Sequence, residues 1–267
     1  MAIENSIIVP AYHEKLNIRP LTTRVFAALG NEDSKKTEII FVDDNSKDGS
    51  VEEVQTLQKE GYNVSIIVRT AERGLSSAVL RGFVESNGEY LVCMDADLQH
   101  PPESIPDFLK TLRNHPFVIG TRYAAGVGID KDWPLYRRVI SGGARLLALP
   151  LTSVSDPMSG YFGLHKKYLI NAKQVDAQGF KIALELLAKL PLPKDQTVGE
   201  FPYSFGVRTE GESKLSSKVM IQYLAQLKDL YVYKFTWSTI IGFFLIFSIL
   251  IMTFILELLK GYHASKN

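Results

Sequence analysis

The stretch LVCMDADLQHPP, residues 91–102, is an apolar run that stops abruptly at two aspartates one residue apart. Successive side chains of a strand point to opposite faces, so Asp95 and Asp97 share one side because they flank Ala96. Two carboxylates side by side repel each other unless a cation lies between them. The stretch therefore predicts a buried strand whose end binds a cation.

The same pattern of short apolar runs recurs along the first part of the chain. The apolar runs lie at 5–12, 38–44, 64–69 and 90–97. Longer amphipathic segments lie between them, at 17–29, 51–61 and 75–86. This rhythm predicts an α/β fold with a mostly parallel sheet and helices on both faces. Ligands of such sheets bind at the carboxyl ends of the strands. Three predicted strand ends carry polar side chains, at 10–14, 43–46 and 95–99.

Composition narrows the class of protein. With 267 residues and 46% hydrophobic composition, the chain can form one main domain with an appendage. A formal net charge of +1, without long runs of like charge, gives no reason to expect nucleic acid as a partner. Cys93 is the single cysteine, which excludes an intrachain disulfide and favours a reducing compartment. No G-x-G-x-x-G or P-loop string occurs, so a nucleotide would have to be bound in another way.

The C-terminal part predicts a membrane anchor. Residues 235–256, FTWSTIIGFFLIFSILIMTFIL, carry no charge and are long enough to cross a bilayer core of about 30 Å. A buried core helix is the alternative, but such helices are usually shorter and keep a polar face. We expect a catalytic domain at 1–215, an amphipathic juxtamembrane helix at 216–234, an anchor at 235–259 and a short tail at 260–267. The N-terminus lacks the features of a signal peptide, which favours a cytosolic catalytic part.

The acidic strand end offers ligands for a hard cation. Asp97 and Gln99, with Asp95 beside them, supply the oxygen ligands that Mg²⁺ or Mn²⁺ prefers. A cation bound in this way usually bridges phosphates, which indicates a nucleotide diphosphate site. The alternative is a pair of solvated carboxylates that cap the helix expected to begin within PPESIPDFL.

A second acidic pair ends the strand expected at 38–44. We expect Asp43 and Asp44 to end a strand that neighbours the one before Asp95, where a carboxylate can accept hydrogen bonds from a base or a ribose. Asp48 or Ser50 is expected to cap the following helix. The two interpretations are compatible.

Cationic side chains form the third element of the predicted site. Arg122, Arg208 and Lys214 are ordinary surface charges by default, but arginine is also well suited to planar recognition of phosphates. A metal-bound diphosphate together with several cations indicates two phosphorylated substrates. One of them is expected to be a lipid, because the site is tethered to a membrane.

Seven motifs in order resemble one known family. They are IIVPAYHEKLNI, IIFVDDNSKDGS, RGLSSAVLRGF, MDADLQHPPE, GTRY, SDPMSGYFGL and VRTEGESKLS. Taken together they resemble the dolichol-phosphate mannose synthases, which are inverting family 2 glycosyltransferases of GT-A fold. The resemblance covers residues 3–235, and the apolar tail resembles that of the single-subunit fungal form in the endoplasmic reticulum membrane.

The resemblance implies transfer of mannose from GDP-mannose to dolichyl phosphate on the cytosolic face, for protein glycosylation and GPI-anchor synthesis, with no regulatory subunit required. It implies catalytic roles for Asp95, Asp97 and Arg122, and metal ligation of Mg²⁺ or Mn²⁺ by Asp97 and Gln99. It implies donor contacts from Pro10, Tyr12, Glu14, Val42, Asp44, Asp95, Ala96, Asp97, Arg208 and Lys214. It implies contacts to the acceptor phosphate from Arg122, Arg137 and Arg208.

Two alternative functions remain open from the sequence. One is a polyprenyl-phosphate glucosyltransferase that uses UDP-glucose, and the other is a non-catalytic, tail-anchored nucleotide-binding scaffold. Glu185 can orient a substrate hydroxyl or serve as an ordinary helix carboxylate. His100 receives no role, because the histidines lack metal-ligand spacing. The string RRVIS, ending at Ser141, resembles a basic-directed kinase site.

Overall fold

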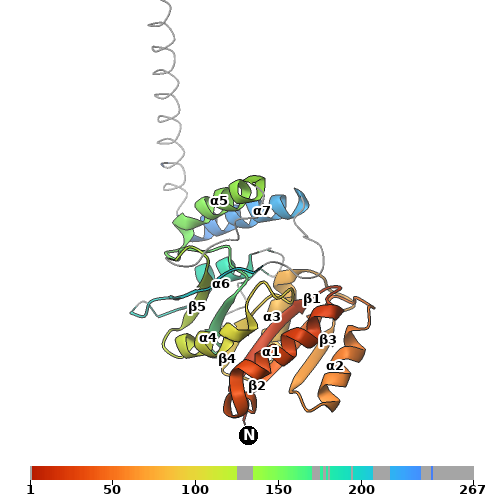
Figure 1. The fold of residues 1–267 in the computed structure, drawn as a ribbon. Coiled ribbons are helices and arrows are strands. Elements are labelled where there is room, and N and C mark those ends of the chain that lie inside the picture. Colours follow the sequence, from red (N-terminus) through yellow and green to blue (C-terminus); the bar gives the residue numbers. More distant parts are fainter. Residues whose placement is uncertain are drawn as a thin grey trace, which may run out of the picture.

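The computed structural model describes residues 2–124, 135–169, 175–176, 179, 181–193, 195–206, 217–235 and 242, with the side chains of 135–139 and 217–218 excepted. Its centre is a seven-stranded sheet of order β3-β2-β1-β4-β6-β5-β7 (Figure 1). The strands are β1 Asn5–Ala11, β2 Thr37–Asp43, β3 Val64–Val68, β4 Tyr90–Cys93, β5 Phe117–Thr121, β6 Phe162–His165 and β7 Gly199–Pro202.

The predicted mostly parallel sheet is confirmed. β1, β2, β3 and β4 pair in parallel, and β7 pairs in parallel with β5. Only β6, among the seven strands, runs antiparallel to its neighbours β4 and β5. The carboxyl ends of six strands therefore lie at one edge of the sheet, and the loop that enters β6 reaches the same edge.

The expectation that the Asp43 strand neighbours the Asp95 strand was wrong. β1 lies between them, because after β3 the chain crosses back over β1 and adds β4 on its other side. The strand order thus reverses at β1. In open α/β sheets such a reversal marks the crevice in which ligands bind.

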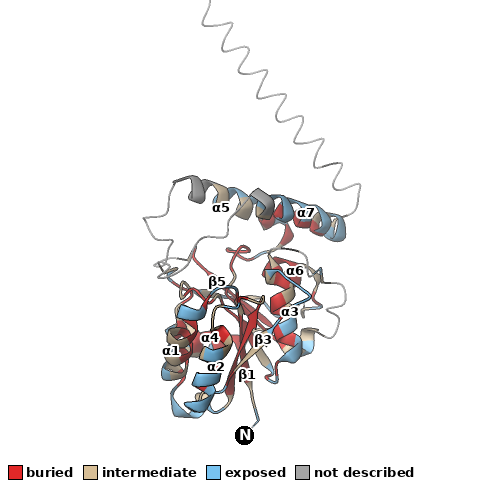
Figure 2. Ribbon diagram, turned by 90° about the vertical axis from the view of Figure 1, so that its right-hand side faces the viewer, coloured by how far each residue is buried: buried red, intermediate tan, exposed pale blue. Residues whose placement is uncertain are grey.

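Helices cover both faces of the sheet. α1 Lys15–Ser34, α2 Ser50–Lys59 and α4 Ile105–Leu112 pack on one face, and α3 Leu75–Glu85 and α6 Ile182–Lys189 pack on the other. The central strands are buried on both sides (Figure 2). Ile7 and Val9 of β1 belong to the first core and Ile8 to the second, as the two-residue period of a strand requires.

α5 Leu135–Ala148 and α7 Ser217–Lys234 lie side by side beyond one end of the sheet (Figure 1). The Tyr223 hydroxyl of α7 donates to the carbonyl of Ala144 in α5 at 2.6 Å. Buried side chains of α7 also pack with Leu184 of α6. The helix Ser217–Lys234 thus lies within the segment 216–234, where an amphipathic juxtamembrane helix is predicted.

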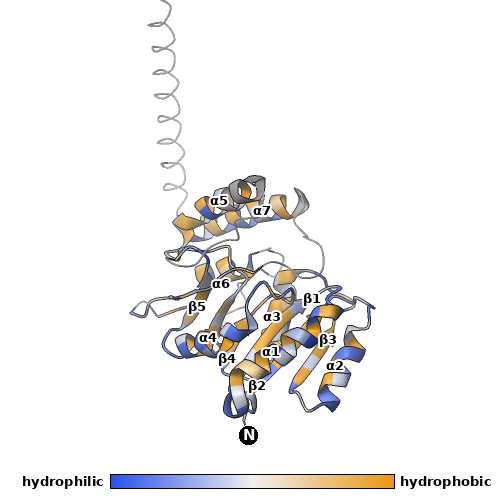
Figure 3. Cartoon of the chain, viewed as in Figure 1, coloured by the Kyte–Doolittle hydropathy of each residue, from blue (hydrophilic) through white to orange (hydrophobic). Residues whose placement is uncertain are grey.

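α5 and α7 also expose large apolar side chains to solvent. Hydrophobic residues are prominent in the described parts of both helices (Figure 3). The exposed ones are Leu146 and Leu147 of α5 and Met220, Ile221, Leu224, Val232 and Tyr233 of α7.

No helix of the described part of the chain is long and apolar enough to cross a membrane. The anchor predicted at 235–259 falls outside the described residues, apart from Phe235 and Gly242.

Candidate active site at the carboxyl edge of the sheet

The acidic turn after β4 is closely tied to the segment after β7. Asp97 is only 4% exposed, and its Oδ1 accepts the backbone N–H of Gln99 at 3.1 Å. The Gln99 side chain donates through Nε2 to the carbonyl of Gly206 at 3.0 Å, and the Gly206 N–H donates to the Gln99 carbonyl at 3.0 Å. These bonds fix the turn, while the Asp95 side chain beside it is 39% exposed.

His100 supports this turn through a hydrogen bond of its buried ring. It is almost fully buried, and its ring is stacked on Tyr161 with centroids 5.2 Å apart. Its Nδ1 accepts the backbone N–H of Asp95 at 2.9 Å, so the proton of the neutral ring lies on Nε2. Burial lowers the pKa of His100 despite the nearby charges of Asp95 and Asp97. His100 is therefore a neutral support of the acidic turn.

A buried ion pair occupies the end of β5. Arg122 donates through Nε to Oδ2 of Asp156 at 2.7 Å and through Nη2 to Oδ1 at 2.9 Å. Asp156 is fully buried and Arg122 nearly so. Burial alone would lower the pKa of Arg122, but the hydrogen bonds and charge of Asp156 outweigh burial and raise it. The guanidinium thus stays charged in every accessible pH range.

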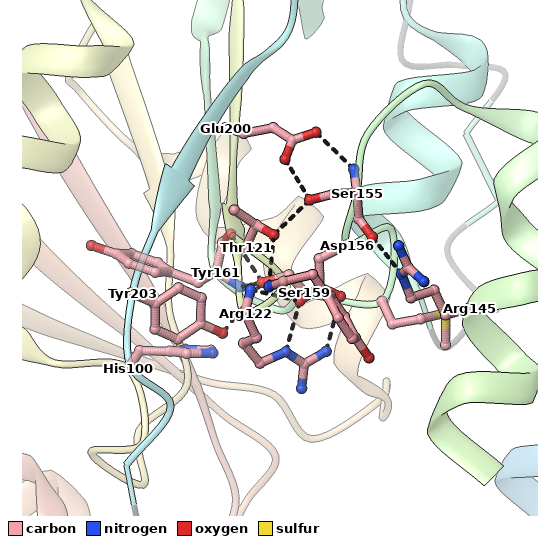
Figure 4. Close-up of polar contacts among 12 residues, drawn as sticks. His100, Thr121, Arg122, Arg145, Ser155, Asp156, Ser159, Tyr161, Glu200 and Tyr203 are labelled. Atoms are coloured by element: carbon pink, nitrogen blue, oxygen red, sulfur yellow. Dashed lines mark hydrogen bonds and ion pairs between the residues drawn. The ribbon is translucent and has the colours of Figure 1, made fainter. Parts of the chain in front are cut away.

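The loop that carries Asp156 is held by a polar network (Figure 4). Glu200 of β7 accepts the backbone N–H of Ser155 at 2.7 Å and also its hydroxyl. The Ser155 hydroxyl lies 2.6 Å from that of Thr121, and Arg145 of α5 donates to the Ser155 carbonyl at 2.6 Å. Residues from β5, β7 and α5 therefore fix the position of Asp156, and through it that of Arg122.

Lys181, directly before α6, adds a second cation. Its Nζ donates to the carbonyl of Met158 at 3.0 Å, in the loop that carries Asp156. Burial, followed by the positive charge of Arg122, lowers the pKa of Lys181 to about 8, while Asp95 and Asp156 act in the opposite direction. Lys181 had no predicted role from the sequence.

The ends of β1 and β2 form the other part of the site. Arg69 donates through Nε to Oδ1 of Asp44 at 2.8 Å, and the Gly74 N–H donates to its Oδ2 at 2.8 Å. Asp44 thus holds the segment after β3 against the end of β2. Arg73 of this segment lies over the ring of Tyr12, 5.9 Å from its centroid.

The structure brings most of the predicted site residues to one edge of the sheet. Pro10 of β1 pairs with Val42 of β2, and Val42 is fully buried in the second core. Glu14 is buried and accepts the side-chain amide of Asn17 at 2.7 Å. Ala96 is buried between the two aspartates of the turn.

The side chains of three predicted cationic residues lie outside the part of the chain that the structure describes. Arg137 lies in α5 with its side chain outside the described atoms, and Arg208 and Lys214 lie outside the described residues. Glu185 is buried and accepts bonds from Lys189 at 2.6 Å and from the Asp176 N–H at 3.1 Å, which indicates a structural role.

The ligands around Asp97 fit a divalent cation. Because the Gln99 amide nitrogen donates to Gly206, the amide oxygen is the atom of this side chain that can serve as an oxygen ligand together with the carboxylate of Asp97. Within the described residues, no three His, Cys, Asp or Glu side chains gather as a metal site. One carboxylate and one amide oxygen suit Mg²⁺ or Mn²⁺, since such ions commonly complete their shell with water and substrate phosphates.

Comparison with known proteins gives one consistent family. Residues 6–171 match the family described as Glycosyl transferase family 2. The chain is 68% identical over 254 residues to the dolichol-phosphate mannosyltransferase of Saccharomyces cerevisiae, covering 94% of this chain and 95% of that protein. It is 59% identical to the dolichol-phosphate mannosyltransferase of Mycosarcoma maydis over 86% of this chain and 80% of that protein.

A solved structure has the same fold. Glucosyl-3-phosphoglycerate synthase from Mycobacterium tuberculosis, in complex with Mn²⁺, UDP and glucosyl-3-phosphoglycerate, aligns with a TM-score of 0.62 at 18% identity. The alignment covers 87% of this chain and 80% of that one. At this identity the likeness is evidence for the fold alone, which confirms the expected GT-A fold.

Proposed function

The chain belongs to the dolichol-phosphate mannosyltransferases of glycosyltransferase family 2, and from that premise we propose that its donor is GDP-mannose, bound with Mg²⁺ or Mn²⁺. One observation supports this proposal: three features meet at the same edge of the sheet. They are the acidic turn at 95–99, the guanidinium of the buried Arg122, and the ammonium of Lys181. Such a site suits two anionic substrates that must approach each other. A single chain is proposed to suffice, without regulatory subunits.

Asp97 and Gln99 hold the cation in this proposal. The M. tuberculosis enzyme of the same fold was solved with Mn²⁺ and UDP, which supports a divalent ion as the cofactor in general. The ion neutralises the diphosphate leaving group when it is bound. Asp95, more exposed than Asp97, faces the donor sugar or ribose. Pro10, Tyr12, Glu14, Val42 and Asp44 line the nucleoside at the ends of β1 and β2.

The chemistry then follows from the charges of the site. The acceptor is a phosphate monoester, already ionised near neutral pH, so its oxygen attacks the anomeric carbon without a strong general base. The bond from that carbon to the GDP oxygen breaks as the new bond forms on the opposite face, with inversion. Arg122, Arg137 and Arg208 bind the acceptor phosphate, and fixed positive charge lowers the repulsion between the two substrates.

A donor competition separates this proposal from transfer of glucose. Purified chain is incubated with dolichyl phosphate and a mixture of GDP-mannose and UDP-glucose carrying different labels. We expect only the mannose label in the lipid fraction. Glucose label in that fraction would favour the glucosyltransferase alternative, and nucleotide binding without label in lipid would favour the scaffold.

The pKa of Lys181 predicts a pH dependence. Below about pH 8 the ammonium is charged and attracts the anionic donor, and above that pH the charge is lost. The kcat/KM for the nucleotide sugar should therefore fall above about pH 8. Lys181→Arg keeps its charge and should remove this decline, and Lys181→Met should be weak at every pH. A wild-type profile without a decline up to about pH 9.5 would contradict the role of Lys181.

We also propose that the C-terminal segment at 235–259 anchors the chain in the endoplasmic reticulum membrane, with the catalytic part on the cytosolic face. The exposed apolar side chains of α5 and α7, which leads into that segment, support a position at the lipid surface. Arg122 would then face a phosphate presented by the bilayer.

Alkaline carbonate extraction tests the anchor. The full chain should stay with microsomal membranes, whereas a chain that ends at Phe235 should be released, because only the long apolar segment crosses the hydrocarbon core. Protease added to sealed microsomes should digest the catalytic part if it faces the cytosol. Release of the full chain by carbonate would contradict a spanning anchor, and protection from protease would contradict the orientation.

A further inference from the structure

The short segment before α6 is held between two helices. On one side, the Ser76 hydroxyl of α3 donates to the carbonyl of Gly179. On the other side, the Gln226 side chain of α7 binds both backbone groups of Lys181. Its Oε1 accepts the Lys181 N–H at 3.0 Å and its Nε2 donates to the Lys181 carbonyl at 3.2 Å.

The orientation of the Gln226 amide is set by a third contact. Nε2 also donates to Oε2 of Glu185 at 3.0 Å, and a carboxylate accepts only from the nitrogen side of the amide. Gln226 itself is 6% exposed, so water has little access to replace these bonds. A Cβ on Gly179 would overlap the Gln226 amide, so the backbone approaches this side chain as closely as only glycine allows.

The same lysine reaches the candidate active site at its other end. Its Nζ binds the carbonyl of Met158, two residues after Asp156, and Asp156 holds Arg122. A continuous series of bonds thus runs from α7 through Gln226 and Lys181 to the cationic part of the site. α7 is the helix that exposes Ile221 and Leu224 on its outer side.

We propose that Gln226 is a positioning residue, through which the packing of α7 against α6 sets the position of the Lys181 ammonium in the active site. The inference rests on the proposed function, since Lys181 matters for the reaction only if the site binds anionic substrates. A purely structural Gln226 would stabilise the helix packing without acting through Lys181. The two roles predict different effects of a Gln226 substitution on activity in a protein in which Lys181 is already replaced.

The first test is a double-mutant cycle. Gln226→Leu places an apolar side chain of similar size beside Leu227 and Leu230 and removes the acceptor of the Lys181 N–H, whereas the Lys181 carbonyl still accepts the Glu185 N–H. We expect kcat/KM to fall about tenfold, the effect of one unmet buried hydrogen bond. In a Lys181→Met background the same change should have little further effect, because residues that act as a unit are not additive. The matched control is Gln222→Leu, an exposed glutamine one turn earlier on α7, with wild-type activity expected.

A second measurement does not depend on activity. Trace acetylation of the full-length protein, followed by peptide mass spectrometry, gives the reactivity of Lys181 relative to the exposed Lys110 of α4. Gln226→Leu and Gly179→Ala, which displaces the Gln226 side chain from the opposite direction, should each raise the relative reactivity of Lys181 several-fold. Gln222→Leu should leave it unchanged.

The outcomes separate this inference from the proposed function. Unchanged reactivity of Lys181 in both Gln226→Leu and Gly179→Ala, or additive losses in the cycle, would overturn the positioning role. Wild-type protein that transfers no mannose would instead overturn the proposed function.

Discussion

Replacement of Asp97 by alanine should lower kcat for mannose transfer by about a thousandfold, which is the size of effect seen when a main electrostatic contact of a reaction site is removed. Asp97 is buried, and its carboxylate is the charged oxygen ligand of the proposed cation site. Without it, the leaving diphosphate loses its counter-charge. The measurement is a manganese titration of the transfer rate.

The control for this change is Asp97→Asn. The amide oxygen of asparagine can still accept the Gln99 N–H, which keeps the turn but removes the charge. Both variants should lose activity, and the unfolding midpoint should fall more in Asp97→Ala. Wild-type activity with saturable manganese dependence in Asp97→Ala would contradict the assignment of the metal ligand.

The second large effect is expected at the buried ion pair. Arg122→Met leaves the charge of Asp156 buried without its guanidinium partner, which should lower the free energy of unfolding by about 3–5 kcal/mol. Activity should fall at least about a hundredfold, because the acceptor phosphate loses its cation. Arg122→Lys keeps the charge but loses the two-bond geometry, so it should be intermediate.

A double variant separates stability from catalysis. Arg122→Met with Asp156→Leu replaces the ion pair by apolar side chains, and such replacements commonly restore stability. Urea unfolding should show recovery of much of the lost free energy, while mannose transfer stays lost. Full stability of Arg122→Met alone, or activity of the double variant, would contradict the account of this pair.

Much of the fold could be predicted from hydrophobic periodicity. The runs at 5–12, 38–44 and 64–69 are long enough to be recognised as strands, and each is followed by an amphipathic segment or a polar turn. The order of the strands could not be predicted, because pairing depends on where a crossover returns rather than on local pattern. β6 has only four residues, Phe162–His165, too few for a period to show, and its antiparallel direction was not predicted.

Only part of the site could be predicted from the sequence, because only some of its residues are adjacent in the chain. Asp95, Asp97 and Gln99 are adjacent in sequence, so their chemistry is visible as a motif. Arg122 and Asp156 are 34 positions apart, and nothing local marks them as partners. The motif SDPMSGYFGL did contain Asp156, although only as part of the family resemblance.

Lys181 and His100 were missed because their roles depend on burial. A lysine directly before an apolar helix is an ordinary feature of sequence, and its low pKa comes from the surrounding fold. His100 was set aside for lack of metal-ligand spacing, and the structure gives it a supporting hydrogen bond instead. The signal that could have found it is its position three residues after Asp97, between an acidic turn and a proline pair.

The most direct test of the central claim is mannose transfer into lipid. Purified, detergent-solubilised chain is incubated with labelled GDP-mannose, dolichyl phosphate and Mn²⁺, with and without a chelator, and the label extracted into organic solvent is counted. We expect label in the lipid fraction that the chelator abolishes. No label there, although GDP-mannose is bound, would contradict this expectation.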